Sequence, residues 1–392
     1  MSKSLSEVVP SRPMVGLLAA SCGIVVANIY YAQPLVGLIG PALHMGPRAA
    51  SLIVSLTQLG YAAGLLFLVP LGDLVENRRL VVTTIAAAIL PLILAGLAWN
   101  GPMMLVVSAL IGLTSVAVQM LIPLAAHLTP EARRGRVVGL VMSGLLFGIL
   151  LSRPAASVLA AMGSWRVVFF VSALLMAGMA LLLSRTLPYR KPEANHHYGE
   201  LLASLFVLPV RFPVLRQRAG YQAACFAGFS LFWTGAPLYL IHAFGFTQRG
   251  IAVFALAGAA GAFAAPVAGH LADRGHTRAG TLGALSGVIM AFGVAALGGW
   301  LHSVLVLALA GIVLDAAVQT SLVLGQRSIY TLAPELRSRM NGIFMAIFFV
   351  GGAIGSAVTG LLLTHVGWGG LCAAGAVLPM LALVYFLAVQ RG

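Results

Sequence analysis

The sequence predicts an all-α polytopic membrane protein in which twelve transmembrane helices form two pseudo-symmetric six-helix bundles. Three observations support this fold class: the composition, the number of long apolar runs and an internal repeat. Of the 392 residues, 60% are hydrophobic and only 8% are charged, whereas a soluble domain carries about 25% charged residues. The mean hydropathy is +1.01. This composition excludes a soluble enzyme, a secreted disulfide scaffold and a disordered chain.

The predicted spans are apolar runs that are separated by charged or Gly/Pro-rich breaks. A helix needs about 20 apolar residues to cross a bilayer, and each run reaches that length. The twelve predicted spans are 14–40, 48–71, 79–99, 102–127, 137–161, 165–187, 216–242, 250–272, 279–300, 303–327, 339–364 and 368–390.

One connection is much longer than the others. Residues 188–215 contain four prolines and charges of both signs, and their apolar stretch is too short to span a membrane. We therefore predict an N-terminal six-helix bundle over 1–187, a cytoplasmic central linker over 188–215 and a C-terminal six-helix bundle over 216–392.

The distribution of basic residues predicts the orientation. With an even number of spans both termini lie on one side, and that side collects 18 of the 23 lysines and arginines, whereas the opposite side holds three. Basic residues accumulate in cytoplasmic loops. We therefore expect a multi-pass protein of the cell inner membrane with both termini in the cytoplasm. The net charge of +14 is then explained by basic residues that lie in cytoplasmic loops beside the lipid surface. We therefore expect no nucleic-acid partner.

The two halves of the sequence repeat. Asp73 follows the second span and Asp273 follows the eighth, and the loop TPEARRGRVVG before the fifth span matches APELRSRMNG before the eleventh. Both halves have the same number of spans and the same orientation. This parallel repeat is typical of secondary transporters that are built from two bundles.

The loop GHLADRGHTR resembles the loop signature of the major facilitator superfamily, and VPLGDLVENRR is a degenerate copy in which Val69 and Leu74 replace Gly and Arg. The segment NIYYAQPL is similar to the twelve-helix drug and metabolite efflux branch of arabinose-efflux-like permeases. The resemblance implies alternating access and a conformational latch between the loop Asp and the start of helix eleven. Loop capping and simple topology charges remain alternatives. The latch residues that the resemblance implies are Asp73, Arg78, Arg79, Asp273, Arg274 and Arg278.

Two charged residues lie deep inside predicted spans, Asp315 in the tenth and Arg153 in the fifth. A charge at this depth costs about 3 kcal/mol, so each needs a partner, water or a change of protonation. At 1.5 Å per residue, both lie roughly 15–18 Å from the same membrane surface. Neither has a charged counterpart in the repeat.

Asp315 is our candidate for the proton-coupling carboxylate, and Arg153 is expected to tune it or to bind an anionic group. A neighbouring guanidinium favours the charged carboxylate, whereas desolvation favours the neutral acid. A static buried ion pair that joins the two halves is the alternative.

Polar and aromatic side chains lie at helical spacing on several predicted spans, and the resemblance implies that such stripes line a central cavity. Several of them could instead bridge neighbouring helices. The residues expected to line the cavity are Asn28, Tyr31, Gln33, Gln58, Tyr61, Gln119, Trp233 and Gln319.

The sequence carries no phosphate-binding loop, no metal-ligand spacing and no nucleophile–base pair, so we expect neither an enzyme nor a cofactor. Its function is expected to be efflux of a small organic solute or drug by a monomer that uses the proton gradient. In drug antiporters the fifth helix carries a Gly before its proline, where this chain has Arg153 before Pro154. Uptake of an organic anion through Arg153 and a membrane sensor that transports nothing are the alternatives.

Overall fold

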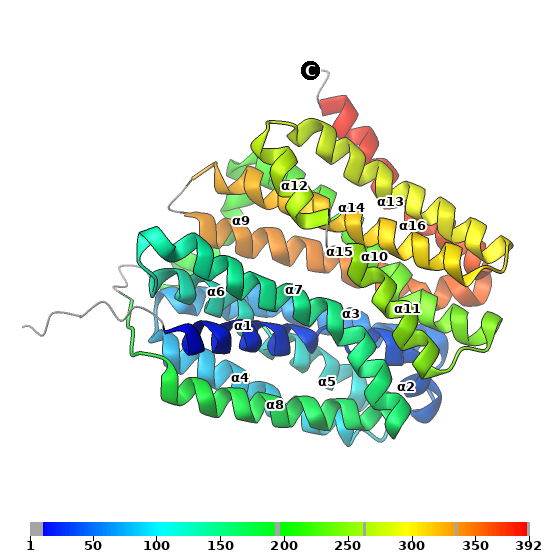
Figure 1. The fold of residues 1–392 in the computed structure, drawn as a ribbon, viewed down its shortest axis with the longest axis horizontal. Coiled ribbons are helices and arrows are strands. Elements are labelled where there is room, and N and C mark those ends of the chain that lie inside the picture. Colours follow the sequence, from blue (N-terminus) through cyan, green and yellow to red (C-terminus); the bar gives the residue numbers. More distant parts are fainter. Residues whose placement is uncertain (1–10, 193–196, 262–263, 334–335, 390–392) are drawn as a thin grey trace, which may run out of the picture.

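The computed structural model describes residues 11–192, 197–261, 264–333 and 336–389. The helices of the first half are α1 (Arg12–Ala27), η1 (Gln33–Leu35), α2 (Val36–Ala42), α3 (Pro47–Phe67), η2 (Val69–Asp73), α4 (Asn77–Gly96), α5 (Gly101–Thr114), α6 (Ala117–His127), α7 (Glu131–Met162) and α8 (Trp165–Thr186). Those that follow are α9 (Tyr198–Arg211), α10 (Pro213–Phe244), α11 (Gln248–Gly261), α12 (Ala264–Asp273), α13 (Thr277–Trp300), α14 (Val304–Tyr330), α15 (Arg337–His365) and α16 (Gly367–Val389) (Figure 1).

The predicted all-α polytopic fold is confirmed. Within the described ranges, ten helical segments of 20 to 32 residues are long and apolar enough to cross a membrane. They coincide with ten of the twelve predicted spans. The span predicted at 102–127 is one of them, although its helix is interrupted between α5 and α6 at Ser115.

The other two predicted spans are not among these ten helical segments. The run 14–40 contains α1, a stretch of turns, η1 and α2, and Pro34 lies in the first turn of η1. A proline has no N–H to continue a helical ladder, which is consistent with the helix starting again at this point. The run 250–272 contains α11 and α12, which flank residues 262–263; these two lie outside the described residues.

Glycines allow two pairs of helices to cross at very short distance. A Cβ on Gly148 of α7 would lie 2.2 Å from the carbonyl oxygen of Gly23 in α1. In the second half, a Cβ on Gly355 of α15 would lie 2.0 Å from the carbonyl oxygen of Ala227 in α10. Only glycine permits this approach, so the same kind of contact holds α1 to α7 and α10 to α15.

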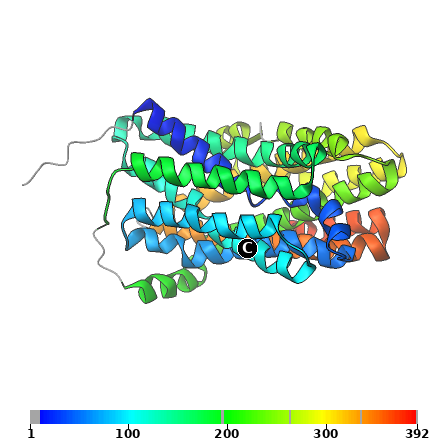
Figure 2. The same cartoon turned by 90° about the horizontal axis from the view of Figure 1, so that it is seen from below.

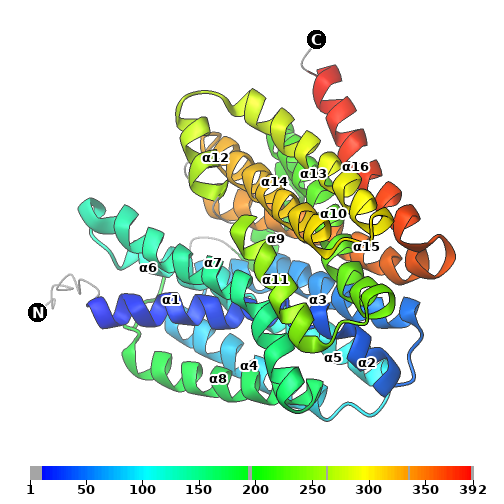
Figure 3. The same cartoon turned by 45° about the vertical axis from the view of Figure 1, so that its right-hand side comes forward.

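One end of the molecule, which we call the basic end, carries the starts of α1, α4, α7 and α15. Its basic residues include Arg78, Arg79, Arg133, Arg134, Arg337 and Arg339. Figures 1 and 3 show two groups of helices that lie close together near α2 and α11 and diverge toward α6 and α12.

The contacts between the two groups agree with this picture. The Oγ atoms of Ser55 in α3 and Ser356 in α15 are 2.8 Å apart. Closer to the opposite end, a Cβ on Gly360 would lie 2.2 Å from the carbonyl oxygen of Pro47. The helices α3 and α15 therefore pack tightly in the half of the molecule that is remote from the basic end.

The predicted linker 188–215 contains the short helix α9, which Figure 2 shows beside the basic end. Tyr198 at its start donates a hydrogen bond to the carbonyl oxygen of Phe67 (2.7 Å). Arg190, which precedes it, donates to Asn77 Oδ1 (3.0 Å) and accepts from the Asn77 backbone N–H (2.9 Å). The division of the chain into two bundles at this segment stays a prediction.

Candidate functional site

The two charged residues at bilayer depth lie next to each other. Nη1 of Arg153 in α7 is 3.7 Å from Oδ2 of Asp315 in α14, and the side chains are only 5% and 6% exposed. The pair therefore connects a helix of the first half to a helix of the second half through the interior.

The guanidinium of Arg153 is surrounded by aromatic rings. Its Cζ atom lies 4.2 Å from the ring centre of Trp233, 4.9 Å from that of Phe229 and 5.7 Å from that of Tyr30. Its Nε donates a hydrogen bond to Gln33 Oε1 at 3.0 Å. A cation within about 6 Å of an aromatic ring is attracted by the electron-rich face, so these rings replace part of the lost hydration.

Asp315 is held independently of the arginine. The indole Nε1 of Trp233 donates a hydrogen bond of 2.7 Å to Asp315 Oδ1. From the other side, a Cβ on Gly261 of α11 would lie 2.5 Å from Asp315 Cβ, and one on Gly258 would lie 2.9 Å from Oδ2. The carboxylate is therefore fixed by the indole and by the backbone of α11.

Local sequence explains how these side chains meet. Phe229 and Trp233 are four residues apart and share one face of α10, and the ring of Phe226 stacks on Phe229 with 5.0 Å between the centroids. Tyr30 and Gln33 lie where the chain leaves α1 and enters η1. This break in the first span turns both side chains toward α7.

The residues predicted to line a cavity fall into two groups. Gln33 and Trp233 contact the ion pair directly, and Gln319 lies half-buried one helical turn after Asp315. Gln58 bridges the two halves, because its Nε2 donates to Ser230 Oγ at 2.6 Å.

The other predicted lining residues contact neighbouring helices. The Oδ1 atom of Asn28 accepts a hydrogen bond from Ser172 of α8 (2.5 Å). Tyr31 lies beside the same serine. Gln119 donates to Tyr61 Oη at 3.3 Å, and the Tyr61 ring lies 4.5 Å from that of Phe349.

The predicted latch residues lie at the basic end. Asp73 lines a small cavity of about 50 Å³ together with Gln119, His127, Arg190 and Ser338, the last of which lies in the first turn of α15. Asp73 therefore lies near the start of α15, which is the eleventh predicted span.

The remaining latch candidates show no contact between the halves among the described residues. Arg78 donates to the Ser184 carbonyl oxygen, within the first half, and Arg79, Arg274 and Arg278 are exposed. The side chain of Asp273 lies outside the described residues. Their role as a latch stays a prediction.

Sequence reasoning missed part of the site. The polar and aromatic stripes of the first and seventh predicted spans include Tyr30 and Phe229, but the glycines of α11 were not selected. The i, i+3 spacing of Gly258 and Gly261 in LAGAAG is the signal that could have predicted a close approach to another helix.

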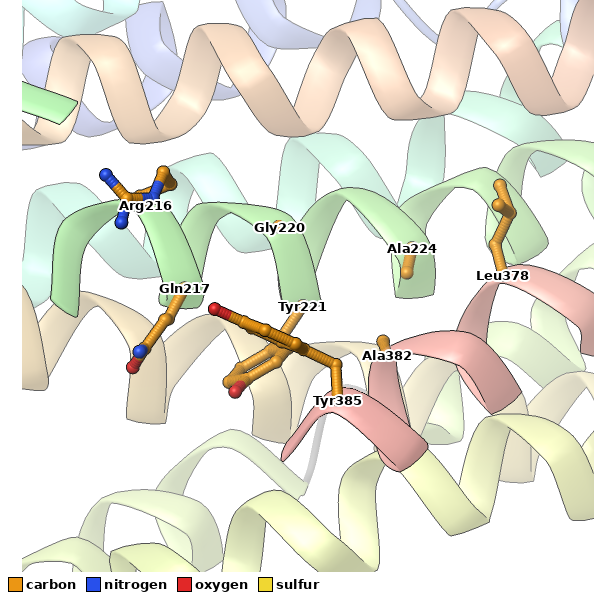
Figure 4. Close-up of a pocket in the computed structure, with 8 residues that line it drawn as sticks. All are labelled: Arg216, Gln217, Gly220, Tyr221, Ala224, Leu378, Ala382 and Tyr385. Carbon is orange, nitrogen blue, oxygen red and sulfur yellow. The ribbon is translucent and has the colours of Figure 1, made fainter. Parts of the chain in front are cut away.

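Another hollow lies elsewhere on the molecule, between the start of α10 and the end of α16. Figure 4 shows the residues that form its walls. The walls are mostly apolar, and the cavity has a volume of about 350 Å³. The residues that line it are Arg216, Gln217, Gly220, Tyr221, Ala224, Leu378, Ala382 and Tyr385. It contains no pair of buried charges, so it offers less chemistry than the site of Arg153 and Asp315.

Comparisons with known proteins agree with this arrangement. The chain is 42% identical over 395 residues to "Uncharacterized transporter YgaY" of Escherichia coli O157:H7, covering 100% of this chain and 98% of that one. It is 24% identical over 320 residues to "Probable sugar efflux transporter" of Mannheimia succiniciproducens, covering 80% and 77%. The solved structure of a mutant of the nucleoside transporter NupG has the same fold, with a TM-score of 0.76 at 16% identity over 95% and 99% of the chains.

The sequence profile of the Major Facilitator Superfamily matches residues 17–329, which is most of the chain. This family and the named relatives are transporters, not enzymes. The protein is therefore a membrane-embedded transporter of small molecules, and it belongs to the Major Facilitator Superfamily.

Proposed function

We propose that this transporter exports a small organic solute in exchange for protons, and that Asp315 is the residue that carries the proton. The observation that carries the proposal is the ion pair of Arg153 and Asp315, which joins α7 to α14 at bilayer depth. Intramembrane ionisable residues commonly mark substrate and proton pathways. The relative named as a sugar efflux transporter supports the outward direction.

The ion pair offers a physical reason for coupling. In the unloaded site the charges of Arg153 and Asp315 balance, and their attraction holds α7 and α14 together. A proton or a solute group that neutralises the carboxylate removes this attraction. The two helices can then separate, and the transporter can change from one open side to the other. When neither proton nor solute is bound, Arg153 and Asp315 stay paired and the helices stay together. The transporter therefore exchanges solute for protons and does not let either of them pass alone.

In this proposal the protein lies in the cell inner membrane, and the basic end faces the cytoplasm. The tight packing of α3 against α15 then closes the outer side, and solute enters from the inner side. The proton gradient supplies the energy, and the chain works as a monomer without a cofactor.

A second candidate function is the uptake of an organic anion together with a proton. It is favoured by the charge balance at the site, because protonation of Asp315 leaves the buried charge of Arg153 uncompensated. A bound anion would restore neutrality, and a buried unpaired charge is costly.

A panel of metabolites and toxicants tests the proposal. Cells that produce the wild type, D315N or D315E are compared for the intracellular accumulation of each compound. We expect D315N to accumulate the exported solute as non-producing cells do, D315E to retain part of the export, and the control S143A, which changes an exposed side chain, to match the wild type. Full export by D315N would overturn the role of Asp315.

A further inference from the structure

We propose that the solute is a small organic cation, and that Arg153 occupies the place of its cationic group when the site is empty. This inference rests on the proposed exchange at Asp315 and names its substrate class. The tethered guanidinium of the protein is displaced when a guanidinium or ammonium group of the solute arrives.

The surroundings of Arg153 have the composition of a cation-binding site. One carboxylate and the rings of Trp233, Phe229 and Tyr30 enclose the guanidinium. Aromatic rings together with a carboxylate recognise organic cations through cation–π attraction and charge. These groups would serve a cation of the solute equally well, because none of them depends on the arginine being attached to α7.

The contact of Arg153 with the carboxylate is weak in its geometry. The separation of 3.7 Å exceeds the 2.7–2.9 Å that is typical of charge-assisted hydrogen bonds. The hydrogen bond of ordinary length that the guanidinium makes is the one from Nε to Gln33 Oε1, at 3.0 Å. An ion pair of this length is easier to open than a bidentate one.

The carboxylate, in contrast, is held in place whether or not the arginine is present. Trp233 donates to Asp315 at 2.7 Å, and the glycines of α11 leave no space behind it. Departure of the guanidinium therefore leaves a carboxylate and an indole face that are already oriented for the next cation. Such preorganisation strengthens binding.

After displacement, the Arg153 side chain has another hydrogen-bond partner on its own helix, α7. Ser157 lies one turn after Arg153 on α7 and is fully buried, and its Oγ has no hydrogen-bond partner among the described residues. A guanidinium that leaves Asp315 can donate to this hydroxyl. A buried hydroxyl without a partner is unfavourable, so the move satisfies an atom that is otherwise unpaired.

The charge balance of exchange is the same for both ligands of Asp315. A proton on the carboxylate and a monovalent cation beside it each change the net charge of the site from zero to +1. The two loaded states are therefore electrically equivalent, and the exchange of one for the other moves no net charge. An anion would instead need the N–H edges of Arg153, one of which already donates to Gln33.

Three probes of similar shape test the charge of the ligand: phenylguanidinium, neutral phenylurea and anionic benzoate. Binding of each to the purified full-length protein in lipid nanodiscs is measured by calorimetry at constant pH. We expect R153Q, which removes the competing cation, to bind phenylguanidinium at least about tenfold more tightly than the wild type. D315N should lose this binding, and phenylurea and benzoate should bind no variant appreciably.

A second variant keeps the test decisive if R153Q does not fold. Q33L retains both charges and removes the hydrogen bond that holds Arg153 Nε, so it should also tighten phenylguanidinium binding, by a few-fold. Equal or weaker binding of phenylguanidinium to R153Q and Q33L would overturn the inference. Benzoate binding to the wild type that R153Q abolishes would overturn it in favour of an anion. Because these assays measure binding, they are independent of whether Asp315 couples transport to protons.

Discussion

The indole N–H of Trp233 donates a 2.7 Å hydrogen bond to Asp315, while the face of the same indole covers the guanidinium of Arg153 at 4.2 Å. One side chain of α10 thus contacts both buried charges. The indole therefore fixes the carboxylate and covers the guanidinium.

W233F should change the pH dependence of transport. Phenylalanine keeps an aromatic ring but removes the N–H that stabilises the charged carboxylate, so protonation of Asp315 becomes easier. We expect the pH of half-maximal exchange in proteoliposomes to rise by about one unit. The control is W368F, because Trp368 is buried and donates to a backbone carbonyl, that of Ala295 (2.9 Å). An unchanged pH profile in W233F would contradict the assigned hydrogen bond.

Alanine at the glycines of α11 should damage the site. A Cβ on Gly258 would lie 2.4 Å from the Trp233 ring, and one on Gly261 would lie 2.5 Å from Asp315. We expect G258A and G261A to lose transport and about 1–3 kcal/mol of stability through overpacking. Thermal unfolding in detergent measures the stability. G283A is the matched control, because no atom lies within 4 Å of its added Cβ, and it should unfold at or above the wild-type temperature.

A crosslink between α3 and α15 should stop the transport cycle. The Oγ atoms of Ser55 and Ser356 are 2.8 Å apart, so S55C combined with S356C brings two thiols within reach of a disulfide. We expect oxidation to block transport and reduction to restore it, because alternating access requires these helices to separate. Each single variant should be insensitive to oxidant. Undiminished transport by the crosslinked protein would show that these helices stay together throughout the cycle.

N77A should loosen the connection between α4 and the segment that follows α8. The Asn77 side chain donates to the Gly72 carbonyl oxygen (2.7 Å) and accepts from Arg190 (3.0 Å). We expect a loss of about 1–2 kcal/mol of stability and faster cleavage by trypsin after Arg190. T83A, in which an exposed hydroxyl that bonds only to its own helix is removed, should behave like the wild type in both assays.

The membrane fold could be predicted because it depends on the length and polarity of segments. The apolar runs matched ten helical spans, and the depth of Arg153 and Asp315 followed from the fixed rise of a helix. In a membrane protein, the distance of a residue from the membrane surface is the position that the sequence predicts most directly. The short separation of these two residues is what the structure adds.

The direction in which a side chain points was harder to predict. Asn28 and Tyr31, which are predicted to line a central cavity, both contact Ser172 of α8, and their place in the cavity lining stays a prediction. The helix that precedes them ends at Ala27, so helical periodicity does not extend to these two residues. The glycines of α11 were missed because the spacing of small residues indicates a close helix contact but does not identify the helix that makes it.

Transport by D315N in proteoliposomes tests the role of Asp315 most directly. The solute identified by the panel is placed inside with an imposed pH gradient, and in parallel it is exchanged against labelled solute without a gradient. We predict that D315N loses pH-driven transport and that any downhill flux it retains does not depend on pH, since an asparagine neither binds the coupling proton nor pairs with Arg153. Gradient-driven transport by D315N at the wild-type rate would contradict the assignment of Asp315 as the proton carrier.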